Sequence, residues 1–234
     1  AESITQAQQL WSIREHIPLA QAEEAGDRLS EDLSHTAMLD LAGDETVTFT
    51  CMPPRTGYRA GVDRDPAHGA VIPPLHLSAN YSFAGFGEKR AYDYTRSGNP
   101  TRSLLADAIA ELERGAGGVI TSSGMSAVDL VLSLLEPGAH VVAPHDCYGG
   151  TWRLFEARAR KRQIKVTYVN QGDLDAVEAA LAQNAALLWI ETPSNPLMRV
   201  VDVSALARRA KAAGARVAVD NTFLSPALQK PITL

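Results

Sequence analysis

The sequence contains only two cysteines, Cys51 and Cys147, and no C-x-x-C pair. Two cysteines cannot form the disulfide framework of a small secreted domain, and the six histidines are scattered without the spacing of a zinc site. No apolar run approaches the ~18 residues of a membrane-spanning helix, and the N-terminus lacks a secretory signal pattern. We therefore expect a cytoplasmic protein with no metal site and no membrane partner.

The sequence also has no excess of basic residues, with 22 Lys and Arg against 27 Asp and Glu. The formal net charge is -5 and the pI is near 5.7, which argues against a nucleic-acid partner. Hydrophobic residues make up 45% of the chain and charged residues 21%, so a sizeable buried core is expected.

Two regions of the chain differ in pattern. In residues 1–51, the stretch QAQQLWSIREHIPLAQAEEAGDRL indicates an amphipathic helix interrupted at Pro18, and ETVTFTC indicates a short strand. No catalytic pattern occurs there. From about residue 116, short apolar strands alternate with amphipathic helices. The expected strands are 117–121, 139–144, 164–170, 186–192 and 215–220, and the expected helices are 103–113, 126–136, 151–162, 173–183 and 202–214.

This alternation predicts an α/β fold with a parallel sheet, because the strands are apolar on both faces, as in strands covered by helices on two sides. Ligands of such sheets bind beyond the carboxyl ends of the strands. The G-A-G-G sequence at residues 115–118 is no dinucleotide fingerprint, because it precedes an expected strand instead of following one.

Polar or small residues follow several of these strands. The turn Ser122-Ser123-Gly124-Met125-Ser126 exposes backbone N–H groups at a helix start, which suits a phosphate, although a serine N-cap would explain it equally. Tyr148 lies on a glycine-flanked loop, where its ring could stack on a flat ligand or cover the core. Asn195 lies between two prolines that stiffen its loop, and a simple turn is the alternative.

A carboxylate, Asp220, ends the last apolar strand. It needs a charged or donor partner, for which a pyridinium N–H and a nearby arginine are both candidates. Upstream, YDYTRSGNPTR carries Tyr94 and Arg96, which suit a phosphate or carboxylate, although an exposed loop ion pair is the alternative. A phosphate site, a stacking ring and an acidic strand end together predict a site for pyridoxal 5′-phosphate (PLP).

The motifs YDYTRSGNPTR, SSGMSA, PHDCYGG, ETPSNPLMRVVD and VDNTFLSPALQ closely resemble those of the Cys/Met-metabolism PLP-dependent enzymes, over roughly residues 58–234. The stretches GAVIPPLHLSANYSFAGFGEKR and APHDCYGG are most similar to those of the bacterial cystathionine γ-synthases, also called O-succinylhomoserine (thiol)-lyases. The resemblance implies fold type I of the PLP-dependent transferases, the aspartate-aminotransferase-like fold. The implied reaction is γ-replacement in methionine biosynthesis, in which an acyl-homoserine and cysteine give cystathionine.

The resemblance also implies roles for single residues. The backbone amides of Gly124 and Met125 would hold the PLP phosphate, and Tyr148 would stack on the ring and assist proton transfer. Asp220 would pair with the pyridine nitrogen, and Asn195 would lie near O3′ or the substrate carboxylate. Two further residues, Tyr94 and Arg96, would reach the phosphate in a neighbouring subunit. The active site would therefore need a dimer, and the family is typically a homotetramer.

The sequence departs from the family pattern at both ends. The family's Schiff-base lysine stands in a motif like S-x-T-K-Y, which none of the five lysines here matches, Lys230 included. We expect the chain to lack that lysine and the small C-terminal domain, to be inactive, and to leave an unpaired sheet edge. Met52 stands about where the family's initiator methionine would fall.

The expected organisation follows from these departures. Residues 1–51 would be an extension that is not native to the fold. Residues 52–115 would form an N-terminal arm and helix that contact the neighbouring subunit's site, and residues 116–234 would form part of the PLP-binding domain. Three alternatives stay open: a cystathionine γ- or β-lyase, a methionine γ-lyase, and a non-catalytic paralogue that acts through mixed oligomers.

Overall fold

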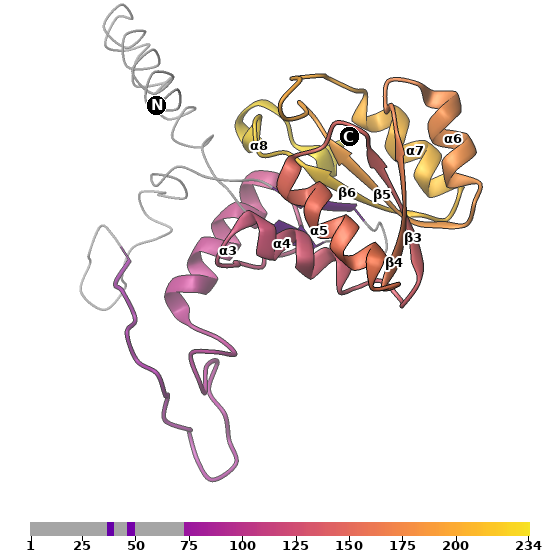
Figure 1. The fold of residues 1–234 in the computed structure, drawn as a ribbon. Helices are drawn as coiled ribbons and strands as arrows, with labels where there is room; N and C mark the ends of the chain where they lie inside the picture. The colour runs from indigo at the N-terminus through magenta and orange to yellow at the C-terminus, as the bar shows by residue number, and fades with distance from the viewer. Residues whose placement is uncertain (1–36, 40–45, 50–72) are drawn as a thin grey trace, which may run out of the picture.

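A computed structural model describes residues 37–39, 46–49 and 73–234 (Figure 1). The expected helix interrupted at Pro18 lies outside the described residues. The strands are β1 Ala37–Leu39, β2 Thr46–Phe49, β3 Ala139–Pro144, β4 Ile164–Val169, β5 Ala185–Glu191 and β6 Arg216–Asp220. The helices are α3 Pro100–Glu113, α4 Gly124–Leu132, α5 Gly149–Arg160, α6 Leu174–Leu181, α7 Val203–Ala212 and α8 Ser225–Leu228, followed by the 3₁₀ turn η1 Pro231–Thr233.

The strands form one sheet in the order β1-β2-β6-β5-β3-β4. Every neighbouring pair is parallel except β1 and β2, so the predicted, mostly parallel α/β sheet is confirmed. From β3 the chain passes outward to β4 and then returns to β5 on the other side of β3. The strand order therefore reverses between β3 and β5, and a ligand site is expected beyond their carboxyl ends.

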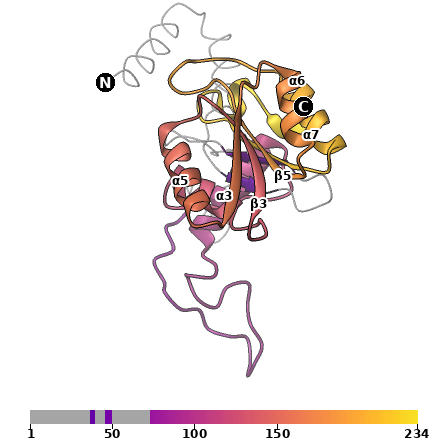
Figure 2. The ribbon, with the colours of Figure 1, turned by 45° about the vertical axis from the view of Figure 1, so that its right-hand side comes forward.

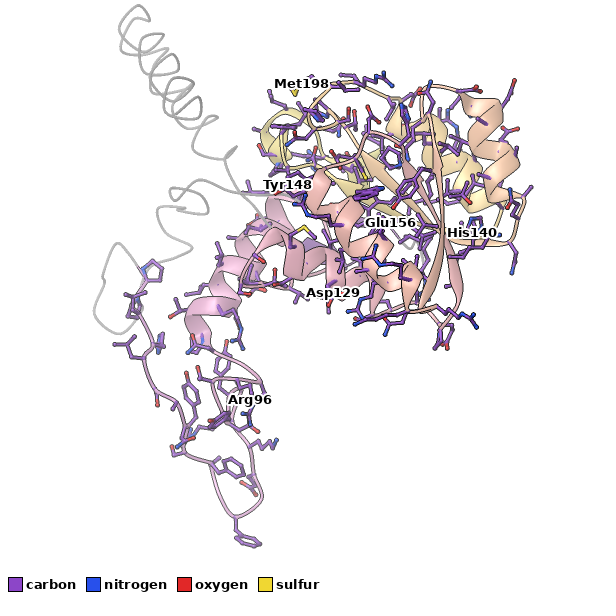
Figure 3. All side chains as sticks on the ribbon, viewed as in Figure 1. Arg96, Asp129, His140, Tyr148, Glu156 and Met198 are labelled. Atoms are coloured by element: carbon purple, nitrogen blue, oxygen red, sulfur yellow. The ribbon has the colours of Figure 1, made fainter. Side chains whose placement is uncertain are left out.

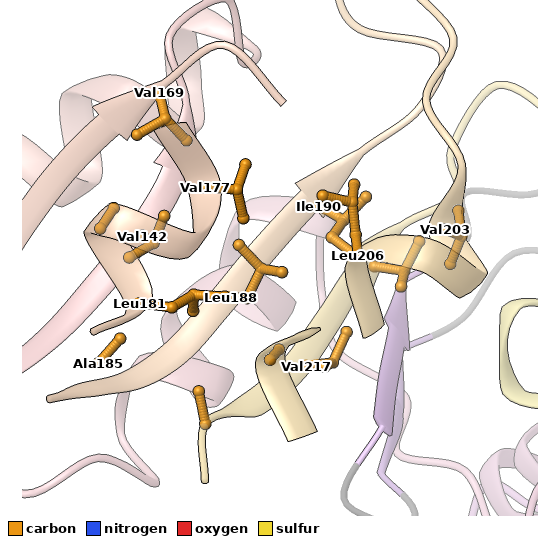
Figure 4. Packing of buried hydrophobic residues seen from close by; sticks show 14 residues of the cluster. Val142, Val169, Val177, Leu181, Ala185, Leu188, Ile190, Val203, Leu206 and Val217 are labelled. Carbon is orange, nitrogen blue, oxygen red and sulfur yellow. The ribbon is translucent and has the colours of Figure 1, made fainter. Parts of the chain in front are cut away.

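Helices cover both faces of the sheet, which explains why its central strands are apolar throughout. Side chains alternate between the faces along each strand. In β3, Val141 and Ala143 pack toward α4 and α5, whereas Val142 packs toward α6 and α7. The two helix layers lie on opposite sides of the strands (Figure 2), and the side chains between the sheet and the α6–α7 layer interdigitate closely (Figure 4).

Side-chain caps fix where several helices begin. Asn99, Ser123, Asp173 and Asp202 each accept a hydrogen bond from a backbone N–H in the first turn of α3, α4, α6 and α7, respectively. Such caps satisfy N–H groups that have no partner within the helix. The cap at Asn99 starts α3 at Pro100, three residues before the expected start at 103, because proline is favoured in the first turn.

Within the part of the chain that the structure describes, the strand expected at residues 117–121 is the one predicted element that is wrong. The segment contains a single bridge residue, Val119, and no strand. Gly117 and Gly118 provide no side chains for either face of a sheet, and a Cβ on Gly118 would lie 2.6 Å from the carbonyl oxygen of Ala106. The segment therefore lies against α3 and leads directly to α4.

The edge of β6 is paired, contrary to the expected open edge. β2 lies parallel to β6, with Thr46 opposite Val217 and Phe49 opposite Asp220. β2 also confirms the short strand predicted within ETVTFTC. Residues 46–49 thus supply ladder hydrogen bonds to a strand whose central residues, 217–219, are fully buried.

We expect deletion of residues 1–51 to leave the α/β core folded but to increase self-association. Removal of β2 unpairs the N–H and C=O groups along one edge of β6, and such edges pair with other chains. Far-UV circular dichroism should change little, while light scattering should show higher-order species. A cooperative loss of helix signal on deletion would show instead that the segment is needed for folding.

Residues 73–99 form an arm that extends away from the body of the molecule in both ribbon views (Figures 1 and 2). Two isolated bridges, Asn80–Tyr94 and Gly85–Glu88, hold its turns. Leu77 is 90% exposed and Phe86 is completely exposed. The arm therefore presents exposed apolar side chains at a distance from the body. Among the described helices, none has the length and apolar character needed to cross a bilayer.

Candidate functional site

The candidate site lies at the carboxyl ends of β3, β5 and β6, next to the reversal in strand order. Glu191 ends β5 and Asp220 ends β6, and the two are register partners across the parallel pair. Tyr148 follows β3 and is the N-cap residue of α5. The sheet therefore gathers two carboxylates and an aromatic ring that are far apart in the sequence.

The start of α4 provides free backbone donors. Ser123 is the N-cap, and its hydroxyl accepts from the N–H of Ser126 at 3.2 Å. Gly124 and Met125 are the first two helical residues, so their N–H groups have no acceptor within the helix. The N-cap interpretation of the serine is thus correct, and it leaves the two amides assigned to phosphate available.

Tyr148 lies directly beside this helix start. A Cβ placed on Gly150 would overlap the Tyr148 ring and lie 2.9 Å from Sδ of Met125. Glycine at position 150 therefore allows the ring to approach the first turn of α4. The Tyr148 side chain is 43% exposed, so one part of its ring remains accessible to a ligand.

Asp220 has none of the arginine partners that the sequence left open. Its Oδ1 accepts from the N–H of Thr222 at 3.1 Å, and no described lysine or arginine forms an ion pair with it. Burial raises the pKa of Asp220 above its usual value. A half-buried carboxylate without a cation suits a ligand that brings a protonated ring nitrogen.

Glu191 is a site residue that the sequence reasoning missed. Its side chain is buried, and burial raises its pKa to about 7. Backbone N–H groups of Tyr148 and Asn195 donate to the carboxylate and oppose that rise, whereas the nearby Asp220 carboxylate adds to it. The sequence pattern that predicted Asp220 as a site residue, a carboxylate at the end of an apolar strand, also applies to Glu191.

The loop after β5 is fastened to the loop after β3. The hydroxyl of Ser194 donates to Oδ2 of Asp146 at 2.8 Å and accepts from the N–H of Arg199 at 3.2 Å. The same Asp146 oxygen lies 3.7 Å from Nε of Arg199. These contacts keep Asn195, which is partly buried, at the same end of the sheet as Tyr148.

Tyr94 and Arg96 are not brought to this site within the chain. Both lie on the arm, where the guanidinium carbon of Arg96 is 4.9 Å from the Tyr94 ring centroid. Figure 3 shows Arg96 on the arm, well apart from Tyr148 on the body. Among the described residues, the ion pair on the arm joins Lys89 to Asp93 at 2.5 Å and involves neither Arg96 nor Arg102, so the loop ion pair considered for those arginines is not found.

The described residues of the body fit the parts of PLP. The α4 amides suit its phosphate, the accessible Tyr148 ring suits its flat face, and the Asp220 carboxylate without a cation suits its pyridine nitrogen. A metal site has no comparable support, since residues 37–39, 46–49 and 73–234 contain no group of three or more His, Cys, Asp or Glu side chains placed to bind an ion.

Comparison with known proteins gives a consistent result. Residues 56–234 match the family described as Cys/Met metabolism PLP-dependent enzyme. The cystathionine gamma-synthase of Escherichia coli is 53% identical over 177 residues, which cover 75% of this chain and 46% of that protein. The cystathionine beta-lyase of Lactococcus lactis is 41% identical over 174 residues, which cover 74% of this chain and 46% of that protein.

A crystal structure agrees with these sequence matches. The cystathionine gamma synthase of Xanthomonas oryzae pv. oryzae, solved in complex with aminoacrylate and cysteine, is 58% identical and superimposes with a TM-score of 0.73. The match covers 76% of this chain and 46% of that one. The chain thus spans about half the length of the relatives it matches, and β1 and β2 precede the residues matched by the family.

Proposed function

This chain belongs to the Cys/Met metabolism family of PLP-dependent enzymes, and from that premise we propose that it serves γ-replacement in methionine biosynthesis. In this reaction an acyl-homoserine and cysteine give cystathionine. The observation that carries the proposal is the convergence of Tyr148, Asp220 and the α4 amides at one sheet end, in a chain 53% identical to a cystathionine gamma-synthase. The proposed place of action is the cytoplasm.

The proposed roles follow the geometry. Gly124 and Met125 donate their backbone N–H groups to the phosphate, where the helix dipole also favours negative charge. Tyr148 stacks on the ring and assists proton transfer. Asp220 holds the proton on the pyridine nitrogen, and Asn195 lies near O3′ or the substrate carboxylate.

The chemistry requires electron withdrawal from the substrate, which PLP supplies when bound. In the overall reaction the C–O bond at the γ-carbon of the acyl-homoserine breaks, and the acyl group leaves as a carboxylate. A C–S bond to cysteine forms at the same carbon, and the thiol proton is released. The protein residues contribute orientation and proton transfer, for which the exposed hydroxyl-bearing ring of Tyr148 is placed at the site.

A second copy of the chain is part of the proposal. The arm carries Tyr94 and Arg96 away from the site of its own subunit, so they would reach the phosphate in a neighbouring subunit. Its exposed apolar residues, Leu77 and Phe86, support such a contact. We propose a dimer as the minimal site-forming unit, within a homotetramer.

The proposed organisation assigns residues 52–115 to the arm and helix that contact the neighbouring site and residues 116–234 to cofactor binding. Residues 1–51 remain, in this proposal, an extension to the family fold. Two other functions are alternatives to γ-replacement. Lyase chemistry is favoured by the 41% identity to a cystathionine beta-lyase. The other is a non-catalytic role in mixed oligomers, which the exposed apolar side chains of the arm, Leu77 and Phe86, would also serve.

The test has two steps. First, the chain is titrated with pyridoxamine 5′-phosphate, which has the ring and phosphate of PLP but no aldehyde and so needs no lysine. Saturable binding supports the cofactor site, and no binding at millimolar concentration refutes it. Second, the chain with PLP is assayed for cystathionine formation from O-succinyl-homoserine and cysteine, and for cystathionine breakdown.

The products separate the alternatives. Cystathionine formation supports the proposal, whereas breakdown to a thiol, ammonia and an oxo acid indicates a lyase. Binding without either reaction, together with co-purification of an intact synthase, indicates the non-catalytic role. Borohydride reduction followed by intact-mass analysis then shows whether any of the lysines, such as Lys230, carries a pyridoxyl group.

A further inference from the structure

Glu191 combines three features that a structural role in the core does not explain. It is a carboxylate with 5% exposure, it lies at the end of an otherwise apolar strand, and no described lysine or arginine forms an ion pair with it. Burying a carboxylate is costly unless its oxygens accept hydrogen bonds. The partners that compensate this cost therefore indicate what the residue does.

Both partners are backbone amides of residues assigned to the cofactor. The N–H of Tyr148 lies 3.0 Å from Oε1 and 2.8 Å from Oε2, and the N–H of Asn195 donates to Oε1 at 2.8 Å. One carboxylate thus joins the loop after β3 to the loop after β5. Tyr148 is the N-cap residue of α5, and its own backbone N–H, which precedes the helix, has its acceptor in Glu191.

We propose that Glu191 is a positioning residue whose carboxylate fixes the Tyr148 ring and the Asn195 side chain relative to each other at the cofactor site. This inference rests on the proposed function, because it assumes that these two residues face the cofactor. Glu191 itself need not touch cofactor or substrate. It acts through two loop backbones that its oxygens hold together.

The charge state of Glu191 controls this link. The ionised carboxylate accepts through both oxygens in charge-assisted hydrogen bonds. A protonated carboxyl leaves the two amides to share one neutral acceptor, Oε1, and so weakens the link. The pKa of about 7 places the change near neutral pH. The nearby carboxylates of Asp220 on β6 and Asp146 after β3 raise the pKa of Glu191. The neighbouring Cys147 thiol has a pKa of about 12 and therefore stays neutral near pH 7.

The test compares the chain with Glu191→Gln, which keeps the shape but presents one oxygen and one NH₂ group. Glu156→Gln is the control: Glu156 is partly buried and, like Glu191, accepts a hydrogen bond, in this case from the Tyr168 hydroxyl at 3.1 Å, away from the site. Amide hydrogen exchange of the ligand-free chain should show about tenfold lower protection of Tyr148 and Asn195 in Glu191→Gln only. Protection of the core amides in β5 and β6 should be unchanged, which reports an intact fold.

Pyridoxamine 5′-phosphate is the ligand probe. We expect Glu191→Gln to bind it about tenfold more weakly than the unmodified chain at pH 8, and the ratio of the two affinities to approach one at pH 6. Protonation of the ligand itself affects both proteins equally, so it does not change the ratio of their affinities. In the unmodified chain, both amides should also lose protection as the pH falls below 7. In an Asp220→Asn background this loss should remain but occur at lower pH, because the Asp220 charge no longer raises the pKa of Glu191, which assigns the loss to Glu191 and not to Asp220.

Each outcome decides the inference. Unchanged protection of the two amides in Glu191→Gln overturns it, and so does an affinity ratio that is the same at pH 6 and pH 8. Failure of the unmodified chain to bind the probe refutes the proposed function, and the link between the two loops is then decided by amide protection alone.

Discussion

Replacing Asp220 with asparagine is expected to weaken the binding of pyridoxamine 5′-phosphate about 10- to 100-fold. Hydrogen bonds to charged groups contribute roughly 1.5–3 kcal/mol, and asparagine keeps an acceptor oxygen but loses the charge that holds a proton on the ring nitrogen. Fluorescence or absorbance titration of the ligand measures the change. Affinity equal to that of the unmodified chain would show that Asp220 does not contact the pyridine nitrogen.

The same substitution is expected to stabilise the ligand-free chain at neutral pH. Burial raises the pKa of Asp220 in the folded state above its unfolded value, so the folded chain binds the proton more tightly. The carboxylate therefore lowers the free energy of unfolding as the pH rises above its unfolded pKa, and asparagine removes this cost. Asparagine also keeps the acceptor for the N–H of Thr222.

Urea unfolding at pH 7.5 and at pH 4 checks the sign. The gain from Asp220→Asn should be larger at pH 7.5, where more of the carboxylate is ionised. Asp107→Asn is the control, because Asp107 lies exposed on α3, and it should change neither stability nor affinity by more than a few tenths of a kcal/mol. A loss of stability in Asp220→Asn at pH 7.5 would contradict the argument.

Replacing Phe155 with alanine is expected to lower the free energy of unfolding by about 3–5 kcal/mol. Phe155 lies on α5, is fully buried, and meets the Trp189 ring edge-on with ring centroids 5.5 Å apart. Phe155 belongs to the buried cluster that includes Val128 on α4 and Val141 on β3, so its removal would open a cavity between α4, α5 and the sheet. Since α4 and α5 begin at the proposed cofactor site, affinity for pyridoxamine 5′-phosphate should fall as well.

Urea unfolding followed by circular dichroism measures this loss. Trp152→Ala is the matched control, because Trp152 is an aromatic residue on the same helix but is 47% exposed, and its removal should cost less than half as much. The emission of Trp189 should also shift to longer wavelength in Phe155→Ala as water reaches the cavity. Equal losses in the two variants would show that the α5 packing is not the main determinant of stability.

The sequence by itself determined most of the helices and strands between residues 100 and 220. The spacing of apolar residues specified α5, α6, α7 and the strands β3 to β6 to within a few residues. A helix with one face against the core has apolar residues every three or four positions, and a strand buried on both faces is a short apolar run. It also predicted Tyr148, Asn195 and Asp220 as site candidates, because polar residues that end apolar strands need a reason to be there. The strand at 117–121 failed, since its apolar residues were read without the close approach of Gly118 to α3.

Only the tertiary structure decided which of these residues meet. Sequence spacing cannot show that Glu191 reaches the amide of Tyr148, because that hydrogen bond depends on the reversal in strand order that places β3 beside β5. The bond to the amide of Asn195 is local, since the two residues are only four positions apart. The pairing of β2 with β6 likewise joins segments far apart in the chain. Local sequence patterns specify which face of each helix or strand is buried. Strand order and loop contacts specify which other residues that face packs against, and the site depends on these contacts between distant segments.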